Sequence, residues 1–288
     1  MIGRIERVGV VGCGLMGAGI AEVCARAGLD VLVREIDVET LARGRTRIEG
    51  SFGKAVRRGK LTEGEAAAAL ARLAYSTDIG DMADRHLVIE AVTENEAVKL
   101  DVFATLDKVA GPGAILASNT SSIPLMKLAM ATNRPDRVVG LHFFSPVPVL
   151  TLVELVVSLL TSDQTADAVE RFAGDVLGKK VIRSKDRAGF IVNALLIPYL
   201  ISAIRMIESG FATAEDIDTG MVLGCNHPMG PLALADFIGL DTTLAAAQSL
   251  YEEFKEPLYG PPPLLCRMVE AGLLGRKSGR GFYSYEPP

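Results

Sequence analysis

The 288-residue sequence has no tryptophan, only three histidines, and four cysteines, Cys13, Cys24, Cys225 and Cys266, that form no C-x-x-C pair. Scattered cysteines suit reduced thiols in a cytoplasm and argue against a disulfide framework or a zinc site, so we expect no metal. No apolar run reaches the length of a membrane span. The formal net charge of −5 supplies no basic field for nucleic acid and argues against binding to an anionic membrane.

What the chain does have is apolar residues, which make up 49% of it. At this length, such a composition suffices for two domains with sizeable cores, and disorder is not expected.

A glycine-rich stretch near the start predicts a nucleotide-binding turn. The short apolar run Val8 to Val11 is typical of a buried strand, and it leads through Gly12, Gly14 and Gly17 into a helical pattern that continues to Gly28. In this G-x-G-x-x-G spacing, Gly12 permits the tight turn, Gly14 allows close approach of a pyrophosphate, and Gly17 allows helix and strand to pack closely. The phosphates would then lie at the helix N-terminus.

An acidic residue follows at the expected distance. The second apolar run, Val31 to Val33, ends at Arg34-Glu35, which places Glu35 where the fingerprint needs a partner for a ribose 2′-hydroxyl. Glu35 favours NAD as the cofactor. NADP stays open as the alternative, because Arg34 could pair with a 2′-phosphate.

Short apolar strands alternate with helical runs through the first two thirds of the chain. This alternation predicts a Rossmann-type α/β fold, a doubly wound and mostly parallel sheet with ligands at the carboxyl ends of its strands. A helical pair, Val38 to Arg58 and a second helix from the capping box at Thr62 through Leu70, is inserted between strands. The further strands are expected at 73–77, 87–92, 114–117, 138–142, 152–157 and 180–182, with helices at 97–109 and 165–177.

The charged run Lys185-Asp186-Arg187 interrupts this pattern, so we expect domains at residues 1–184 and 185–288. The second domain is predicted to be all-α, with helices at 190–208, 214–222, 233–254 and 264–271. These helices are too apolar to stand alone, so part of their surface must meet the first domain or a second subunit.

His142 and Glu154 form the candidate catalytic pair. His142 ends a predicted strand in G-L-H-F-F-S-P-V-P, and a proline-rich loop turns the chain back into the strand that carries Glu154. A glutamate buried among apolar residues costs several kcal/mol unless it is paired, so a partner is expected. His86 and His227 are interpreted as structural.

Taken together, six motifs resemble those of the L-3-hydroxyacyl-CoA dehydrogenase family over nearly the whole chain. They are V-G-C-G-L-M-G-A-G-I-A, E-A-V-T-E-N-E-A-V-K, A-S-N-T-S-S, G-L-H-F-F-S-P-V-P-V-L-T-L-V-E, G-F-I-V-N and G-R-K-S-G-R-G-F-Y. The resemblance implies NAD, a helical C-terminal dimerisation domain, and an acyl-CoA substrate in a cleft between the domains. Because the chain carries no fused hydratase domain, we expect a short-chain substrate such as 3-hydroxybutyryl-CoA or 3-hydroxyadipyl-CoA.

Carried over position by position, the resemblance assigns roles to further residues. His142 becomes the general base and Glu154 its orienting carboxylate, while Ser121 and Asn193 hydrogen-bond the substrate oxygens. The expected cofactor residues are Gly12, Gly14, Leu15, Met16, Gly17, Glu35, Glu94, Lys99, Ser121, Ser145 and Lys277. Ser51 and Arg58 fall where the family contacts coenzyme A, which supports the same role for the basic cluster Lys54, Arg57, Arg58 and Lys60.

The sequence departs from the family pattern at Ser145, Thr151, Ala188 and Ala194, where the family usually has asparagine, lysine, proline and arginine. Two alternatives to the acyl-CoA enzyme stay open. One is a dehydrogenase of a free hydroxy acid, such as L-gulonate, and the other is a non-catalytic NAD-binding structural protein.

Overall fold

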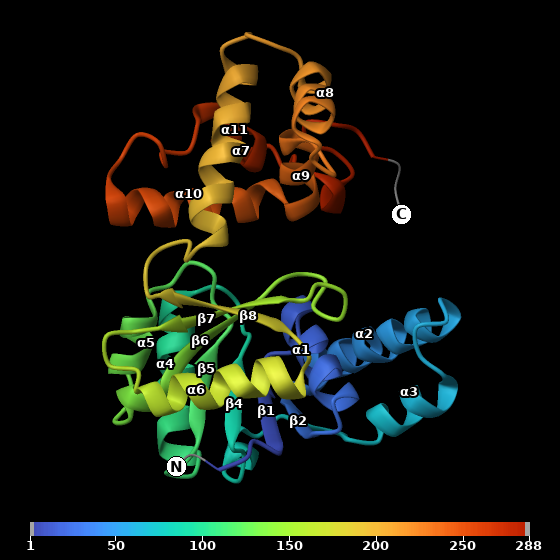
Figure 1. Ribbon diagram of the computed structural model, residues 1–288, viewed down its shortest axis with the longest axis vertical. Helices are drawn as coiled ribbons and strands as arrows, with labels where there is room; N and C mark the ends of the chain where they lie inside the picture. Colours follow the sequence, from blue (N-terminus) through green and yellow to red (C-terminus); the bar gives the residue numbers. More distant parts are fainter. Residues whose placement is uncertain (1–2, 286–288) are drawn as a thin grey trace. The chain divides into compact units, whose positions relative to one another are not determined.

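The computed structural model describes residues 3–285, and the chain divides into two units, Met1–Arg187 and Ala188–Pro288 (Figure 1). The division lies slightly after the expected position between residues 184 and 185. Asp186 explains the difference, because its carboxylate accepts hydrogen bonds from Leu125 N and Met126 N, 2.8 and 2.7 Å away. Its own N–H bonds Val157 O, so this charged run belongs to the first unit.

The first unit is built on one mixed, mostly parallel sheet of eight strands in the order β3-β2-β1-β4-β5-β6-β7-β8. Only the β6·β7 pair is antiparallel among these neighbours. The strands are β1 Arg7–Val11, β2 Asp30–Arg34, β3 Leu73–Ser76, β4 Leu87–Glu90, β5 Ile115–Ser118, β6 Val138–Phe143, β7 Leu152–Val157 and β8 Lys180–Lys185. The doubly wound Rossmann-type sheet predicted from the sequence is confirmed.

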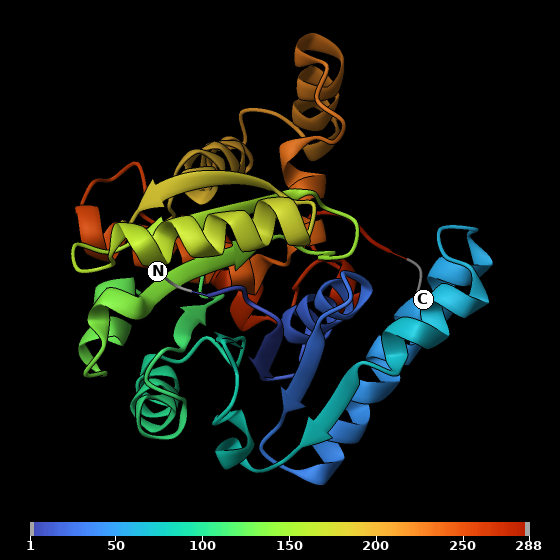
Figure 2. The same cartoon turned by 60° about the horizontal axis from the view of Figure 1, so that its bottom comes forward.

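Helices cover both faces of this sheet (Figure 2). Helices α1 (Leu15–Arg26) and α6 (Asp163–Arg171) share one apolar core with the sheet strands, in which Ile20 and Val169 are fully buried. Helices α4 (Glu96–Val109) and α5 (Leu125–Met130) pack together on the opposite face. The short α5 was not predicted, because one and a half helical turns carry little periodic signal.

Two helices are inserted between β2 and β3, as expected, and lie side by side at the edge of the unit (Figure 1). The first, α2 (Val38–Arg57), begins at Asp37, whose carboxylate caps Thr40 N. The second, α3 (Glu63–Leu70), begins with the predicted capping box, in which the Thr62 and Glu65 side chains each bond the other residue's backbone N–H. The remaining short turns are 3₁₀ at Ile79–Met82 and Pro135–Arg137 and π-helical at Phe172–Val176.

The second unit is helical, as the sequence predicts. Its elements are α7 Val192–Glu208, α8 Ala214–Cys225, α9 Pro231–Ile238, α10 Leu240–Phe254, α11 Pro263–Glu270 and a 3₁₀ turn at Arg276–Ser278. The single helix expected at 233–254 is wrong: Gly239 adopts a φ of 105° and separates α9 from α10. Within residues 3–285, none of the helices combines the length and the apolar character that crossing a membrane requires.

Candidate active site

The glycine turn between β1 and α1 has the geometry that its spacing predicts. Gly12 has a φ of 94°, and a Cβ there would lie 2.6 Å from Ala91 O. At Gly17 a Cβ would lie 1.8 Å from Gly12 O, so only glycine permits this contact between turn and helix. At Gly14, by contrast, a Cβ would meet nothing within 4 Å. The space over Gly14 is open, as close approach of a phosphate to the backbone requires.

The surroundings of this turn fit a dinucleotide. Helix α1 begins after Gly14 without a side-chain cap, so its first N–H groups are available to an anion. The Glu35 carboxylate accepts hydrogen bonds from Cys13 N, at 2.5 Å, and from Ile36 N, at 3.0 Å. These two bonds fix a carboxylate beside the turn, where it can accept from a ribose hydroxyl. Leu15 is largely exposed and Met16 partly buried beside the same turn.

His142 and Glu154 are brought together by strand pairing. They lie opposite each other in the antiparallel register of β6 and β7, and His142 Nδ1 is 2.8 Å from Glu154 Oε2. Glu154 is fully buried and His142 is 6% exposed. Because a carboxylate only accepts, Nδ1–H donates to Glu154 and Nε2 is left as the proton acceptor. The Phe144 ring packs against the imidazole, with the ring centroids 4.6 Å apart.

Asn119 makes a contact beside His142 that the sequence reasoning missed. Its Oδ1 accepts a hydrogen bond from Phe143 N at 2.9 Å, which ties the end of β5 to the residue after His142. The signal was present in the A-S-N-T-S-S motif at a strand end. Nothing local identifies its partner, which lies 24 residues away in sequence.

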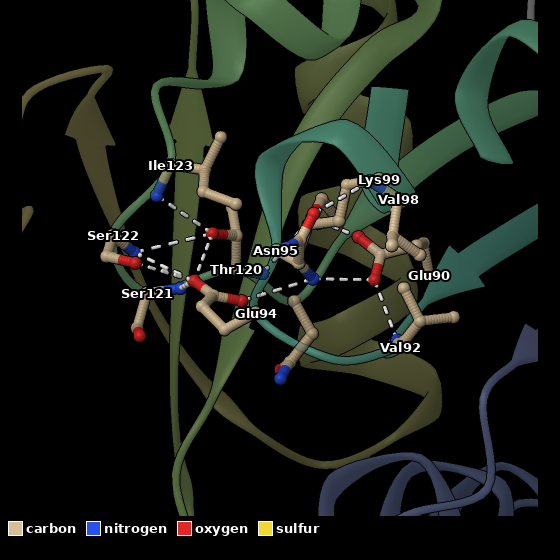
Figure 3. Close-up of polar contacts among 12 residues, drawn as sticks. Glu90, Val92, Glu94, Asn95, Val98, Lys99, Thr120, Ser121, Ser122 and Ile123 are labelled. Carbon is tan, nitrogen blue, oxygen red and sulfur yellow. Dashed lines mark hydrogen bonds and ion pairs between the residues drawn. The ribbon is translucent and has the colours of Figure 1, made fainter. Parts of the chain in front are cut away.

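Glu94 organises the loop after β5 (Figure 3). Its Oε1 accepts hydrogen bonds from Thr120 Oγ1 at 2.5 Å, Ser121 N at 3.0 Å, and the N and Oγ of Ser122 at 3.2 and 2.8 Å. Burial raises the pKa of Glu94, but the Lys99 ammonium and these hydrogen bonds outweigh it and hold the pKa below its ordinary value. Figure 3 shows the Ser121 hydroxyl pointing away from this carboxylate.

Lys99 and Glu90 form a buried ion pair beneath these loops (Figure 3). Lys99 Nζ lies 2.6 Å from Glu90 Oε1 and 3.2 Å from Glu94 Oε2, and the side chains of Lys99 and Glu90 are 1% and 0% exposed. Glu90 also accepts from Val92 N and Ser118 Oγ. The observed contacts of the Lys99 ammonium are therefore with these two carboxylates, and direct contact with a cofactor stays a prediction. Glu90 was missed, because it is the last residue of an otherwise apolar strand.

The residues expected at coenzyme A lie on the inserted helices. The basic cluster Lys54, Arg57, Arg58 and Lys60 is exposed at the C-terminal end of α2, and none of the four side chains forms an ion pair with another described residue. Ser51 is half-buried on the same helix and lies near the buried carboxyl of Glu22 on α1. Burial raises the pKa of Glu22, while Ser51 and Arg26 oppose that rise.

For three further candidates, Ser145, Asn193 and Lys277, the structure shows only their local environment. Ser145 is exposed in the loop after β6, where it precedes Pro146 through a cis peptide bond. Asn193 is half-buried in the first turn of α7, which follows a tight turn at Gly189 (φ 73°). The Lys277 ammonium pairs with Asp241 Oδ2, 2.5 Å away, inside the second unit. Their contacts with cofactor or substrate stay predictions.

The other histidines and the buried cysteines have local contacts. His86 Nδ1 accepts from Glu6 N at 3.2 Å, and His227 Nδ1 lies 3.2 Å from the Tyr199 hydroxyl. Burial, with a smaller contribution from Glu35, raises the pKa of Cys13 to about 12, and burial raises the pKa of Cys24 to about 12. Neither thiol is a nucleophile near neutral pH.

Two family models match the chain: "3-hydroxyacyl-CoA dehydrogenase, NAD binding domain" over residues 7–187 and "3-hydroxyacyl-CoA dehydrogenase, C-terminal domain" over residues 189–285. The chain is 61% identical over 286 residues to 3-hydroxybutyryl-CoA dehydrogenase of Mycobacterium tuberculosis, which covers 99% of this chain and 100% of that relative. The crystal structure of M. tuberculosis FadB2 matches with a TM-score of 0.98 and 61% identity, over 99% of this chain and 100% of that one. The (S)-3-hydroxybutyryl-CoA dehydrogenase of Ralstonia eutropha matches with a TM-score of 0.93 and 48% identity, over 98% and 100%.

Proposed function

The chain belongs to the 3-hydroxyacyl-CoA dehydrogenase family and is an NAD-dependent enzyme of that class, and on this premise we propose that its substrate is a short-chain L-3-hydroxyacyl-CoA of the 3-hydroxybutyryl type. The enzyme oxidises the 3-hydroxyl to a ketone reversibly, and NAD accepts the hydride. The names of the relatives at 61% and 49% identity support the short chain. Acyl-CoA metabolism of the β-oxidation type is the setting we propose.

His142 is the proposed general base, and the observation that carries this role is its buried 2.8 Å contact with Glu154. With Nδ1–H donated to the carboxylate, Nε2 takes the proton of the substrate hydroxyl as C3 loses its hydride. The imidazolium that forms is stabilised by the buried charge of Glu154, which also holds the ring in one tautomer. In the reverse direction the same nitrogen returns the proton.

The remaining site residues position the reactants in this proposal. The Ser121 hydroxyl and the Asn193 amide hydrogen-bond the substrate oxygens. The Gly12, Gly14 and Gly17 turn and Glu35 hold the dinucleotide. Such positioning contributes several kcal/mol to catalysis without forming bonds.

The basic cluster at the end of α2 is proposed to bind the phosphates of coenzyme A. Its four side chains are exposed and lack carboxylate partners among the described residues, so their charge is available to an anion. Ser51, which is half-buried on the same helix, is proposed to line the same region.

We further propose a cytoplasmic homodimer formed through the helical unit. Large apolar side chains are exposed on that unit, including Leu195, Phe211 and Leu223 at 74%, 76% and 79%. Apolar surface of this kind marks a protein interface. Sedimentation at increasing protein concentration tests the dimer, and a monomer at all concentrations would contradict it.

The substrate class is tested by comparing acetoacetyl-CoA with free acids. We expect NADH oxidation with acetoacetyl-CoA and little NADH oxidation with acetoacetate. In the reverse direction we expect little reduction of NAD with L-gulonate. A series of 3-ketoacyl-CoA substrates from four to sixteen carbons then tests chain length, and kcat/KM should fall as the chain lengthens. Equal rates with the free acids would replace the acyl-CoA proposal by the hydroxy-acid alternative.

The catalytic pair is tested by His142→Gln, with His86→Gln as the matched control. We expect His142→Gln to lower kcat by on the order of 10² to 10⁴ with little change in NADH binding, because the variant lacks the base but keeps the glycine turn. Glu154→Gln should cost less, and the double variant should be little worse than His142→Gln. Losses that multiply would show that the two residues do not act as one unit.

A further inference from the structure

The loop at residues 144–151 joins the strand of His142 to the strand of Glu154. Its one deeply buried side chain is Val147, which is 2% exposed and packs so closely on α1 that a Cβ at Gly19 would lie 2.8 Å from Val147 Cβ. A local turn, in which Val149 N and Leu150 N both bond Pro146 O, shapes the rest of the loop. The geometry of the His142–Glu154 pair, called the dyad from here on, therefore depends on a loop with a single apolar anchor.

Packing does not support the outer part of this loop. A cavity of about 480 Å³ lies against it, lined by Pro148, Val149 and Thr151 together with Arg26 and Lys179. Protein side chains do not fill this space, so the outer part of the loop has few packing contacts on that side. Another interaction must fix the backbone there.

Lys179 supplies that interaction. Its Nζ donates hydrogen bonds to Val147 O and to Leu150 O, each at 2.7 Å, and so bridges both ends of the turn. Within the part of the chain that the structure describes, neither carbonyl accepts another hydrogen bond. The π-helical turn Phe172–Val176 places the lysine, since Lys179 N bonds Ala173 O at 2.9 Å.

The charge of Lys179 is not used in an ion pair. None of the ion pairs found within residues 3–285 includes it, and burial followed by the nearby Arg26 guanidinium lowers its pKa. A half-buried ammonium next to another cation is unfavourable, and hydrogen bonds from a charged donor are the compensation that this site offers. The two hydrogen bonds to Val147 O and Leu150 O therefore account for the position of the Lys179 ammonium.

We propose that Lys179 is a positioning residue for catalysis, which clamps the loop at 144–151 and so holds His142 and Glu154 in register. The inference rests on the proposed role of the dyad. Lys179 touches neither reacting group; it acts on the two strands through the carbonyls that connect them. Its loss widens the range of His142–Glu154 geometries and leaves the glycine turn unchanged.

The test is Lys179→Met, which keeps the aliphatic stem and removes the donors, with Lys180→Met as the matched control because the Lys180 side chain is exposed. We expect Lys179→Met to lower kcat for acetoacetyl-CoA reduction about tenfold, the worth of one hydrogen bond from a charged donor, with NADH Kd changed by less than about twofold. Lys180→Met should stay within about twofold of the wild-type kcat. Lys179→Arg, which keeps charged donors, should recover most of the activity.

A second arm separates this inference from the proposed dyad. In a Glu154→Gln background, Lys179→Met should lower kcat by less than about threefold, because the geometry that it protects is already lost. A full tenfold loss there, or a Lys179→Met variant indistinguishable from Lys180→Met, overturns the clamp while the dyad stands. If His142→Gln itself leaves kcat unchanged, the dyad fails and the clamp fails with it. Should Lys179→Met not fold, Lys179→Leu, which also lacks donors, replaces it with the same outcomes.

Discussion

The buried cation Lys99 provides a sharp test of how the strand-end loops are held. In Lys99→Met the ammonium is removed from between Glu90 Oε1, 2.6 Å away, and Glu94 Oε2, 3.2 Å away. Glu90 is fully buried, so its carboxylate is left without a counter-ion and keeps only the hydrogen bonds from Val92 N and Ser118 Oγ. Breaking one partner out of a buried pair typically costs 3–5 kcal/mol.

Proton uptake limits that cost. Protonating a glutamate at pH 7 costs about 3.7 kcal/mol, from about 2.7 pH units at 1.36 kcal/mol each. We therefore expect Lys99→Met to lower the free energy of unfolding by about 3 to 4 kcal/mol at pH 7. The deficit should shrink as the pH falls, by up to about 1.4 kcal/mol for each unit, because the folded variant then binds a proton that the unfolded chain lacks.

The control is Lys127→Met, which breaks the Lys127–Glu96 pair on the same face of the sheet. That pair is 2.7 Å long but its side chains are 52% and 45% exposed, so less than about 1 kcal/mol is expected. Urea unfolding followed by far-UV circular dichroism measures both, since the chain has no tryptophan to report by fluorescence. Adding Glu90→Gln to Lys99→Met should recover at least half of the loss. Equal effects of the two lysine variants, or a deficit independent of pH, would refute the argument.

Three other outcomes are expected. Glu35, fixed by Cys13 N, should repel a 2′-phosphate and give a preference for NADH over NADPH on the order of a hundredfold in kcat/KM; equal values would contradict its role. The partners of Glu94 outweigh its burial and lower its pKa. Its carboxylate therefore stabilises the fold fully at pH values above the ordinary pKa of glutamate, and this stabilisation is lost as the pH falls through the lowered pKa. Glu94→Gln should destabilise the protein at pH 7 and differ little from wild type at acid pH in the same urea assay. Ser145→Asn should raise kcat/KM for acetoacetyl-CoA roughly tenfold if the longer side chain restores a contact at the nicotinamide end, and a uniform loss on every substrate would mean that the pocket is built around the serine.

The sequence was most informative where local pattern and tertiary structure agree. The glycine turn, the capping box at Thr62 and the strands were predictable because each depends on residues within a few positions. The opposition of His142 and Glu154 was also predictable, since two apolar strands joined by a short proline-rich loop pair antiparallel and a buried acid needs a partner.

The contacts that could not be predicted join residues that are distant in sequence. Asn119 bonds the strand end 24 residues later, and Lys179 bonds carbonyls 29 and 32 residues earlier. Backbone carbonyls carry no sequence signal, so a lysine that serves them resembles any solvated lysine. The break at Gly239 was missed for a related reason: an isolated glycine inside a helical pattern is tolerated, and only its φ of 105° decides that the helix ends there.

Two glutamates of the first unit, Glu90 and Glu154, are fully buried, and their partners differ in chemistry. This difference suits Glu90 to a structural role and Glu154 to the catalytic role proposed above. Glu90 is paired with the Lys99 ammonium, and this buried pair lies beneath the loops after β4 and β5. Glu154 is paired with an imidazole, the side chain that ordinarily changes charge between pH 5 and 8. A buried carboxylate stabilises either cation, but only the imidazole gains and loses its proton at low cost. The strand register that sets His142 opposite Glu154 therefore supports the proposal that His142 accepts the substrate proton and returns it.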